Sequence, residues 1–546
     1  MKIFSVNLRF WSGLLGVFTP GNTRTTTAAL LHPPIDRALA WMAATTICGV
    51  LGGISLVVPP FITWDSAHGF LAWRGTVLGA MNCSISPDPE NIAQDMCEFM
   101  TWWSPGQYLV PGMISLFGVP LGIAMTLTVG SALLVSLIGW VMVVRVFAPQ
   151  RSLAALVVGL IGSFRYSTLA FSTYHGGEIL LQAATPWLVL TALLVPQMRA
   201  VPAGLLAAGA VCLAFLAKLT GLPIIAAALL AGSLVFLVFG RRITYGMIGG
   251  TLGAMAAFAV VYFAALSRGS TPAVQTMGWS LPLQSIALVF LLPWVAGISW
   301  SDPLDLIFPD MPSAYFAYLA PAVLVIGLIV FWQPQTSNEK RLRLFSLWFY
   351  GITTAVFIFL YIHGSALSLE ERHFRSVGTL LFVCAVMSAL ETGTPRWAKS
   401  SFLILCALMA FYGVASFSYQ EFKTARGNSL DRMSWTNQAI FDVAAIEFTK
   451  QIYAREGREA LFVLPSPQMA VTLPTEARVL VIEPNSQPAS QLAGRHFGRV
   501  RGHLVLIMPN TISGTRNSLA LLSAFRDYLP DNWTRMTFPK LSVFLQ

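Results

Sequence analysis

Ionisable residues recur just outside the ends of the long apolar runs of this sequence. They are Asp65 after the first run, Glu178 and Lys218 at the ends of later runs, and Arg372 and Arg375 before another. A carboxylate in such a place can deprotonate a hydroxyl group. Arginine and lysine can hold a phosphate leaving group and offset its charge as the bond breaks. The set predicts chemistry on a lipid-phosphate donor, with Asp65 and Glu178 catalytic and the three cations binding the donor phosphate.

Each of these residues also has a structural interpretation. Asp65 can cap the helix that begins there, Glu178 can favour a helix dipole, and Lys218 can extend to the membrane surface from a helix end. Glu370 and Glu371, beside the two arginines, can form an ion-pair patch on the surface. These interpretations do not exclude a catalytic role for the same side chains.

Four more residues adjoin the same segments and are candidates for supporting roles: His175, Glu371, His373 and Arg74. His175, like His68, is more simply explained as a structural residue. The sequence has no glycine-rich phosphate loop and no metal-spaced cluster of histidine and cysteine. We therefore predict no cofactor and no metal ligand, while a divalent ion between Asp65 and Glu178 stays open.

The composition identifies a polytopic α-helical membrane protein. The chain has 546 residues, of which 55% are hydrophobic and only 11% charged, whereas soluble domains carry about 25% charged residues. Apolar runs long enough to cross about 30 Å of hydrocarbon recur along it. The net charge of +10 does not indicate nucleic acid binding, because the basic residues fall mostly in short loops where they set topology.

The runs predict a transmembrane domain over 38–418 with about eleven helices. Residues 1–37 are basic and are expected in the cytoplasm, whereas the acidic first loop, 61–106, is expected outside. Residues 281–300 contain Pro293 and would invert the charge rule if they crossed, so we expect an interfacial or re-entrant piece there. The expected spans are 38–60, 120–143, 153–172, 179–196, 202–219, 221–239, 244–266, 314–332, 345–363, 376–392 and 400–418.

The first loop is expected to carry two amphipathic helices that lie flat on the membrane. Their apolar residues recur at helical spacing: Ala67, Phe70, Leu71, Val77, Leu78 and Met81 in the first, and Ile92, Met96, Phe99 and Trp103 in the second. Cys83 and Cys97 stand one beside each segment. In an oxidising compartment they can form a disulfide, and the alternative is two free thiols.

Residues 419–546 are expected to form a small extracytoplasmic α/β domain, because charge rises and the apolar runs shorten there. Buried-strand patterns cover 460–464, 478–482 and 503–507, and helical patterns cover 435–454 and 518–528. An inside N-terminus and an outside C-terminus follow from the helix count. We expect an integral protein of a bacterial inner membrane with its active site on the periplasmic side.

The layout resembles the GT-C superfamily of membrane glycosyltransferases, which includes protein O-mannosyltransferases and the lipid A aminoarabinose transferase. Three segments carry the resemblance: 64–68 (Trp-Asp-Ser-Ala-His), 175–180 (His-Gly-Gly-Glu-Ile-Leu) followed by Pro186, and 371–375 (Glu-Arg-His-Phe-Arg). It implies a polyprenyl-phosphate sugar donor, a lipid, glycan or protein acceptor, and transfer with inversion on the extracytoplasmic face. Two positions depart from the protein mannosyltransferases, which have Asp-Glu at 65–66 and usually Tyr at 373.

Two other classes remain open at this point. A transporter or flippase of lipid-linked saccharide would place its polar site near the midplane and show repeated halves, whereas here the polar residues gather on one side and no repeat is visible. A non-catalytic membrane assembly subunit is the other class, and the Asp65-Ser66 pair keeps it open.

Overall fold

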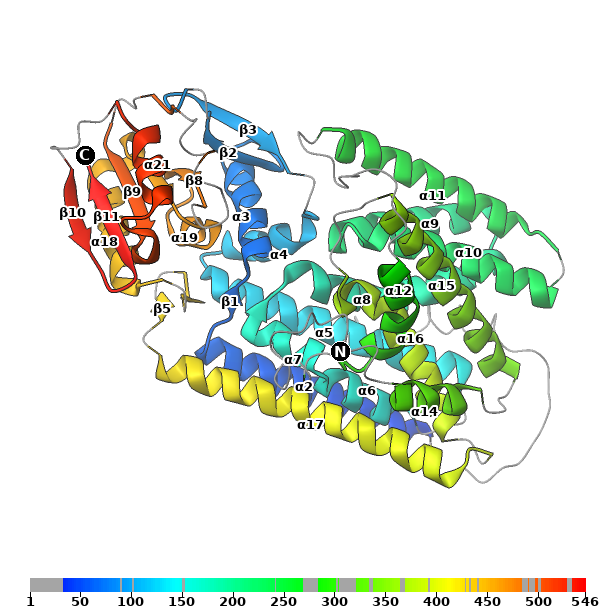
Figure 1. Ribbon diagram of the computed structural model, residues 1–546. Coiled ribbons are helices and arrows are strands. Elements are labelled where there is room, and N and C mark those ends of the chain that lie inside the picture. Colours follow the sequence, from blue (N-terminus) through cyan, green and yellow to red (C-terminus); the bar gives the residue numbers. More distant parts are fainter. Residues whose placement is uncertain are drawn as a thin grey trace.

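The computed structural model describes residues 33–88, 91–100, 103–149, 153–240, 242–268, 283–300, 303, 321–332, 337–363, 369–390, 393–427, 429–431, 434–438, 441–483, 490, 496–498, 502–527 and 533–546. Two parts are visible in Figure 1: a large helical bundle and, at one end of it, a smaller α/β domain formed by the C-terminal residues.

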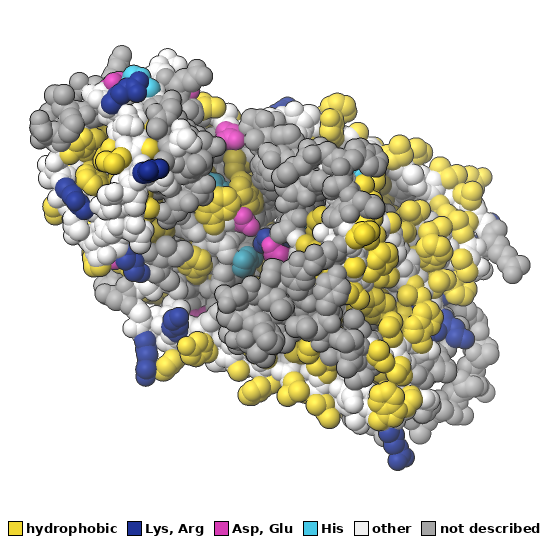
Figure 2. Space-filling view, viewed as in Figure 1, with side chains coloured by type: hydrophobic (Ala, Val, Ile, Leu, Met, Phe, Trp, Pro, Cys, Tyr) yellow, Lys and Arg dark blue, Asp and Glu magenta, His cyan; other side chains and the backbone are white. Residues whose placement is uncertain are grey.

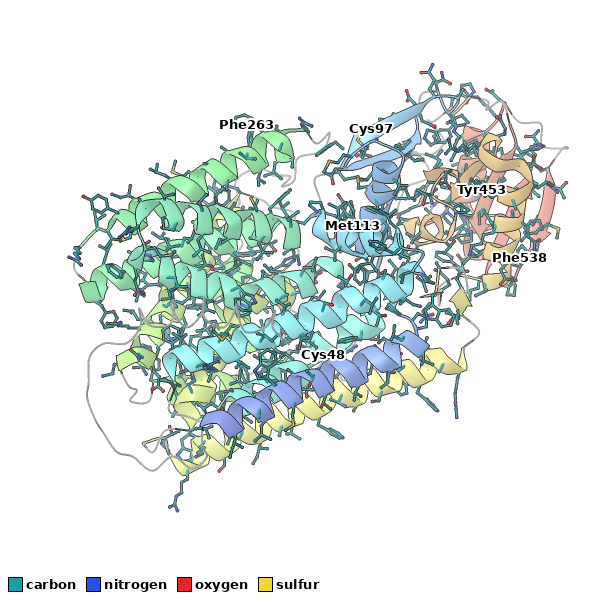
Figure 3. The ribbon with its side chains drawn as sticks, turned by 180° about the vertical axis from the view of Figure 1, so that it is seen from behind. Cys48, Cys97, Met113, Phe263, Tyr453 and Phe538 are labelled. Atoms are coloured by element: carbon teal, nitrogen blue, oxygen red, sulfur yellow. A yellow bond between two sulfur atoms is a disulfide. The ribbon has the colours of Figure 1, made fainter. Side chains whose placement is uncertain are left out.

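The bundle is built from apolar helices whose lengths follow the apolar runs of the sequence. They are α2 (Pro33–Val57), α5 (Leu121–Phe147), α6 (Ala154–Ser163), α7 (Arg165–Ser172), α8 (Gly176–Leu194), α9 (Ala200–Ala217), α10 (Gly221–Gly240), α11 (Tyr245–Ala264), α12 (Leu283–Ala296), α14 (Pro321–Phe331), α15 (Ser337–Ile362), α16 (Glu371–Ala389) and α17 (Arg396–Arg426). The long helices α2, which carries Cys48, and α17 lie along the same edge of the bundle (Figures 1 and 3).

Within the described residues, eight helices are long and apolar enough to cross a membrane, and nine if α6 and α7, bent by 47°, form one span. The part of the chain that the structure describes therefore shows fewer spans than the expected eleven. Of the expected span 314–332, the structure describes only the 11-residue helix α14. The expected span 376–392 corresponds to α16, which begins with three charged residues in its first five. Helix α12 has 14 residues, about 21 Å, and is too short to cross.

The first loop contains one of the two amphipathic helices expected in it. Helix α3 (Trp64–Val77) forms as predicted, but Ala67, Phe70 and Leu71 are buried in protein rather than laid on a membrane. The second segment was predicted wrongly as a helix. It is a hairpin of β2 (Cys83–Pro87) and β3 (Asp95–Phe99), followed by the helix α4 (Gly106–Ser115).

Cys83 and Cys97 are joined by a disulfide within this hairpin. Cys83 pairs with Phe99 and Cys97 with Ile85 across the two antiparallel strands, which brings the two Cα atoms to 5.4 Å. Figure 3 shows Cys97 in the hairpin, which contacts the C-terminal domain through Asp95 and Ile92.

The C-terminal domain is a five-stranded mixed sheet with helices on its faces. The strand order is β10 (Thr534–Thr537), β11 (Leu541–Leu545), β9 (Leu504–Pro509), β7 (Leu461–Leu464), β8 (Arg478–Val481). Strands β8, β7 and β9 are parallel and β11 and β10 antiparallel. The helices are α18 (Val443–Glu456), α19 (Pro467–Thr472) and α21 (Arg516–Ala524). The three predicted strands are β7, β8 and β9, whereas β10 and β11 were not predicted.

The first loop and the C-terminal domain pack as one unit. Leu71 of α3 enters the core on one face of the five-stranded sheet, and Ile92 of the hairpin enters the core on the other. Arg478 of β8 binds Asp95 at 2.7 Å and the carbonyl oxygen of Ile92 at 2.9 Å. The buried Arg74 donates to the carbonyl oxygens of residues 470, 473 and 477 at 2.7–3.1 Å. Helix α3 is therefore fixed by the C-terminal domain as well as by the bundle.

A second sheet of two-residue strands joins the bundle to the C-terminal domain. Its strand order is β4 (Thr173–Tyr174), β1 (Phe61–Ile62), β6 (Thr436–Asn437), β5 (Leu430–Asp431). Strand β1, after α2, pairs in parallel with β4, after α7, and β5 and β6 belong to the connection between α17 and α18. We call this four-stranded sheet the junction sheet.

Candidate active site

The junction sheet brings the two predicted catalytic carboxylates to one place. Because β1 and β4 are parallel, the segments that follow them leave the same edge of the sheet. Asp65 lies three residues after β1, and Glu178 four residues after β4. The carbonyl oxygen of Tyr174 accepts hydrogen bonds from the hydroxyls of Thr63 and Ser66, both at 3.1 Å, and so ties the start of α3 to β4.

Asp65 does not cap α3. The N-cap is Thr63, whose side-chain oxygen accepts from the backbone N–H of Ser66. Asp65 stands in the first turn, where a negative charge still favours the helix dipole. Its side chain is 45% exposed. The interpretation of Asp65 as the cap is therefore wrong, and its carboxylate faces outward from a helix end that another residue completes.

Four of the five predicted site residues form a continuous network of charges, which we call the charged cluster. The Nζ of Lys218 lies 2.6 Å from Oε1 of Glu178. One guanidinium nitrogen of Arg372, Nη1, lies 3.5 Å from Asp65 and 3.5 Å from Glu178, and Nε lies 2.7 Å from Glu370. In Figure 2, acidic and basic side chains meet at the centre of the molecule, between the bundle and the C-terminal domain.

Glycine makes the close approach of Lys218 to Glu178 possible. A Cβ atom at Gly177 would stand 3.2 Å from the carbonyl oxygen of Ala217 and 3.4 Å from the Lys218 side chain. Both contacts are at or below the lower limit of ordinary packing, so a side chain at 177 would push the end of α9 away from α8. Close packing of α8 against the end of α9 thus explains why a glycine precedes Glu178 in this segment.

Burial shifts the pKa values of Lys218, in the charged cluster, and of His175, beside it. Burial lowers the pKa of Lys218, and the carboxylate of Glu178 opposes that shift. Burial also lowers the pKa of His175; Glu178 opposes this shift, whereas Arg372 and Lys218 add to it. His175 is therefore neutral at physiological pH and can take part in hydrogen bonding without adding positive charge.

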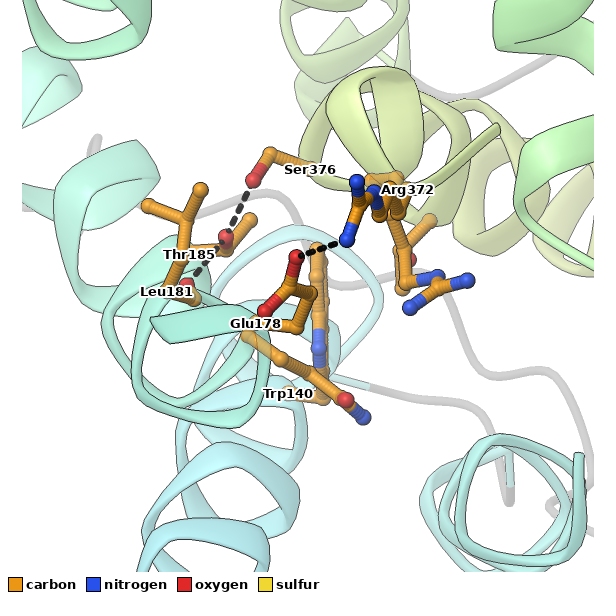
Figure 4. A pocket seen from close by; sticks show the side chains of 9 residues that line it. Trp140, Glu178, Leu181, Thr185, Arg372 and Ser376 are labelled. Atoms are coloured by element: carbon orange, nitrogen blue, oxygen red, sulfur yellow. Dashed lines mark hydrogen bonds and ion pairs between the residues drawn. The ribbon is translucent and has the colours of Figure 1, made fainter. Parts of the chain in front are cut away.

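Arg375, the fifth predicted residue, lies one helical turn beyond Arg372. Together with Glu178 and Arg372 it lines a narrow pocket between α5, α8 and α16, which Figure 4 shows. Its guanidinium lies 4.8 Å from the centre of the Tyr166 ring, and among the described residues it forms no ion pair. The indole nitrogen of Trp140 is fully buried in the wall of this pocket and has no hydrogen-bond partner within the described part of the chain. The pocket therefore contains two donors that a bound acceptor can satisfy.

The supporting residues fall into two groups. His175, Glu371 and His373 lie beside the charged cluster, and the last two are buried in the first turn of α16. Arg74 is different, because its guanidinium is used by the three carbonyl oxygens of the C-terminal domain. Burial lowers its pKa to about 10, so it stays charged at neutral pH. These contacts hold α3 in place, so a supporting role for Arg74 stays a prediction and would act through the position of α3.

One contributor to the site comes from the C-terminal domain and was missed in the sequence. Glu483, just after β8, accepts a hydrogen bond from the indole of Trp64 and lies 3.7 Å from Nε2 of His68. The His68 ring is stacked on Trp103 with a centroid distance of 5.0 Å. Trp64 and His68 lie on either side of Asp65 on α3. The C-terminal domain therefore contacts α3 near its first residue through Glu483, and near its last turn through the carbonyl oxygens that bind Arg74. The sequence feature that could have identified Glu483 is its position, as an acidic residue directly after a buried-strand pattern.

Among the described residues, no group of three or more histidine, cysteine, aspartate or glutamate side chains is placed to hold a metal ion. The partners of Asp65 and Glu178 that the structure provides are Arg372 and Lys218. The arrangement can therefore do two things: remove a proton through an exposed carboxylate, and stabilise a developing anion with nearby guanidinium and ammonium groups.

The apolar bundle, the structured first loop and the C-terminal α/β domain together have the fold of solved structures of ArnT, which confirms at the level of fold the resemblance seen in the sequence. The solved structures that show this are those of ArnT from Cupriavidus metallidurans, bound to undecaprenyl phosphate and in the apo state. Each has a TM-score of 0.52 and 12% identity, and the similarity covers 93% of this chain and 98% of that chain.

The chain is also similar to two cryo-EM structures of the arabinofuranosyltransferase AftD from Mycobacteria. The TM-scores are 0.44 and 0.46, the identities 13% and 14%, and the similarity covers 95% of this chain but 42% of those chains. No family model matches the sequence, and no curated protein matches it. We therefore take the fold from ArnT.

Proposed function

We propose that this chain transfers a sugar from a polyprenyl-phosphate donor to an acceptor hydroxyl on a lipid, glycan or protein. The observation that carries the proposal is the position of Arg372, whose Nη1 lies 3.5 Å from both Asp65 and Glu178. A candidate base and a cation for the leaving phosphate thus meet at one point. The fold shared with ArnT, which has been solved bound to undecaprenyl phosphate, supports a lipid phosphate as the leaving group.

In the proposed reaction Asp65 accepts the proton of the acceptor hydroxyl as its oxygen attacks the anomeric carbon. The bond between that carbon and the phosphate oxygen breaks, and the electron pair leaves with the phosphate. Arg372, Arg375 and Lys218 offset the negative charge that develops on it. A single displacement of this kind inverts the configuration at the anomeric carbon.

The cations differ in their availability to the phosphate. Lys218 and Arg372 are neutralised by Glu178 and Glu370 in the structure, so a phosphate must compete with these carboxylates. Arg375 forms no such pair within the described residues, and its guanidinium lies against the ring of Tyr166. We therefore assign to Arg375 the first contact with the donor phosphate, and to Arg372 a contact that strengthens as the sugar departs.

Conversion of a radiolabelled polyprenyl-phosphate sugar by the purified protein tests the proposal and separates it from a transporter or a non-catalytic subunit. Arg375→Ala should weaken donor binding, and Arg372→Ala should lower both binding and rate. Arg396→Ala, which removes an exposed arginine at the far end of the bundle, is the matched control. Wild-type protein that binds the donor lipid but transfers no sugar to any acceptor class would contradict the proposal.

The proposed orientation places the N-terminus in the cytoplasm and the charged cluster and C-terminal domain in the periplasm of a bacterial cell. The support is the positive-inside rule: the basic loops fall on one side and the acidic first loop on the other. Reporter fusions after residue 426, where α17 ends, should show an extracytoplasmic phenotype. A cytoplasmic signal there would mean that the number of crossings is even.

A further inference from the structure

An exposed tryptophan stands beside the proposed base. Trp64 is the first residue of α3 and directly precedes Asp65. Its side chain is large and apolar, yet the residue is 44% exposed. Consecutive Cα atoms are about 3.8 Å apart, so the indole and the carboxylate border the same surface at the start of α3.

The indole of Trp64 is held in place by contacts from two other parts of the chain. Its N–H donates a hydrogen bond to Glu483 of the C-terminal domain. Its ring stands edge-on to the ring of His68, with a centroid distance of 4.2 Å, and edge-on to Trp103 at 6.2 Å. His68 is itself stacked on Trp103. A ring fixed in this way can bind a ligand on its exposed surface without first losing conformational freedom.

A tryptophan at a helix end of a membrane protein can also anchor the chain among lipid headgroups. The surroundings of Trp64 argue against that role, because its nearest polar partner is the carboxylate of Glu483. Asp65 beside it is 45% exposed, and Arg372 joins Asp65 to the 38% exposed Glu370. Carboxylates repel lipid phosphates, so this surface suits a neutral ligand that approaches from water.

A sugar ring has the two properties that this surface requires. One face of the ring carries C–H groups, which are apolar and slightly positive, and these pack against the negative face of an aromatic ring. The hydroxyl groups at its edge are hydrogen-bond donors for a carboxylate such as that of Asp65. A phosphorylated or sulfated acceptor meets like charge here and is disfavoured.

The position of Trp64 relative to Asp65 indicates which of the two reactants it binds. Arg372 joins Asp65 to the bundle at 3.5 Å, and the proposed function puts the donor phosphate on that side. Trp64 joins the same turn of α3 to the C-terminal domain. A base that removes the acceptor proton must lie between acceptor and donor. We propose that Trp64 binds the acceptor by stacking and that the acceptor is a neutral glycan, an inference that rests on the proposed function.

The test is saccharide binding by the full-length protein in nanodiscs, measured without donor and without turnover. The probe is an array of neutral oligosaccharides, printed beside sulfated oligosaccharides and peptides that contain serine and threonine. Wild type should bind neutral oligosaccharides, and Trp64→Ala should bind them about tenfold more weakly. Trp64→Phe keeps an aromatic face and should bind better than Trp64→Ala. The matched control is Trp397→Ala, which removes a 57% exposed tryptophan at the start of α17 and should bind as wild type does.

Equal binding by Trp64→Ala and wild type would overturn the proposal. Binding of wild type to peptides or sulfated saccharides in place of neutral ones would also overturn it, as would no binding to neutral saccharides. Displacement of the saccharide by a polyprenyl-phosphate sugar, but not by polyprenyl phosphate, would put the donor sugar on Trp64 instead. If Trp64→Ala does not fold, Trp64→Leu replaces it, because leucine is apolar but has no aromatic face, and this variant should bind as weakly.

The outcome for the proposed reaction is separate from the outcome for this site. Sugar transfer to a peptide by a protein that binds no neutral saccharide would keep the reaction and remove the glycan acceptor. Saccharide binding that depends on Trp64, in a protein that transfers no sugar, would keep the saccharide site and remove the reaction.

Discussion

The substitution Asp65→Asn separates the proposed catalytic role of this carboxylate from a structural one. The side chain is 45% exposed, its contact with Arg372 is 3.5 Å long, and the helix is capped by Thr63. An exposed ion pair of this kind contributes about 0–1 kcal/mol to stability. Loss of a general base typically slows a reaction by about 10²–10⁴-fold, which corresponds to about 3–5 kcal/mol in the barrier. The structure thus predicts a normally folded protein that binds donor and does not turn over.

The assay is a single-turnover measurement with a radiolabelled polyprenyl-phosphate sugar, combined with a thermal unfolding curve in the same detergent. Asp95→Asn is the matched control, because Asp95 is in the same loop, is 40% exposed and also pairs with an arginine. That variant should keep its turnover. Near-normal turnover by Asp65→Asn when chemistry limits the rate would refute the assignment, and Glu178 or Glu371 would become the leading candidate for the base.

Three further predictions follow from the same contacts. Lys218→Met should destabilise the protein by about 3–5 kcal/mol because it leaves a buried carboxylate without its nearest cation, and adding Glu178→Gln should restore part of that loss in a denaturation experiment. Thiol labelling of native protein should find Cys83 and Cys97 both unreactive, and two free thiols there would contradict the structure. Because burial lowers the pKa of His175, its folded form binds fewer protons than the unfolded chain. Stability should therefore fall as the pH drops below about 6.5, and His175→Gln should reduce this slope, as followed by the unfolding temperature.

The charged side chains could be selected from the sequence because a membrane protein permits few of them. Asp65, Glu178, Lys218 and Arg372 stand at the ends of apolar runs, where a charge is costly unless it has a partner. The structure brings these four together through helix ends that the hydropathy pattern locates well. Most boundaries of the long helices were predictable to within about five residues for the same reason, since a run of about 20 apolar residues can cross a bilayer only as a helix or a barrel strand. The exceptions are α15, which begins at residue 337 instead of 345, and α17, which ends at residue 426 instead of 418.

The first loop was predicted less well because its apolar residues suit two structures. Met96 and Phe99 recur at a spacing that a helix would place on one face, yet the segment is a strand paired with residues 83–87. Short hairpin strands with mostly exposed side chains have no clear alternation to identify them. The disulfide between Cys83 and Cys97 was the one expectation from the sequence that agrees with the hairpin, because a disulfide requires the two segments to lie side by side.

The arrangement around Asp65 could not be predicted because it depends on contacts between distant parts of the chain. Two-residue strands such as β1 and β4 are too short to leave a pattern, although their parallel pairing sets the distance between Asp65 and Glu178. The contacts that hold α3 likewise join residues about 400 positions apart in the sequence: Trp64 with Glu483, and Arg74 with the carbonyl oxygen of Leu473. Because Asp65 is positioned by both the bundle and the C-terminal domain, the proposed base is sensitive to movement of either. The C-terminal domain therefore belongs to the proposed active site, and its removal should abolish transfer even if the bundle stays folded.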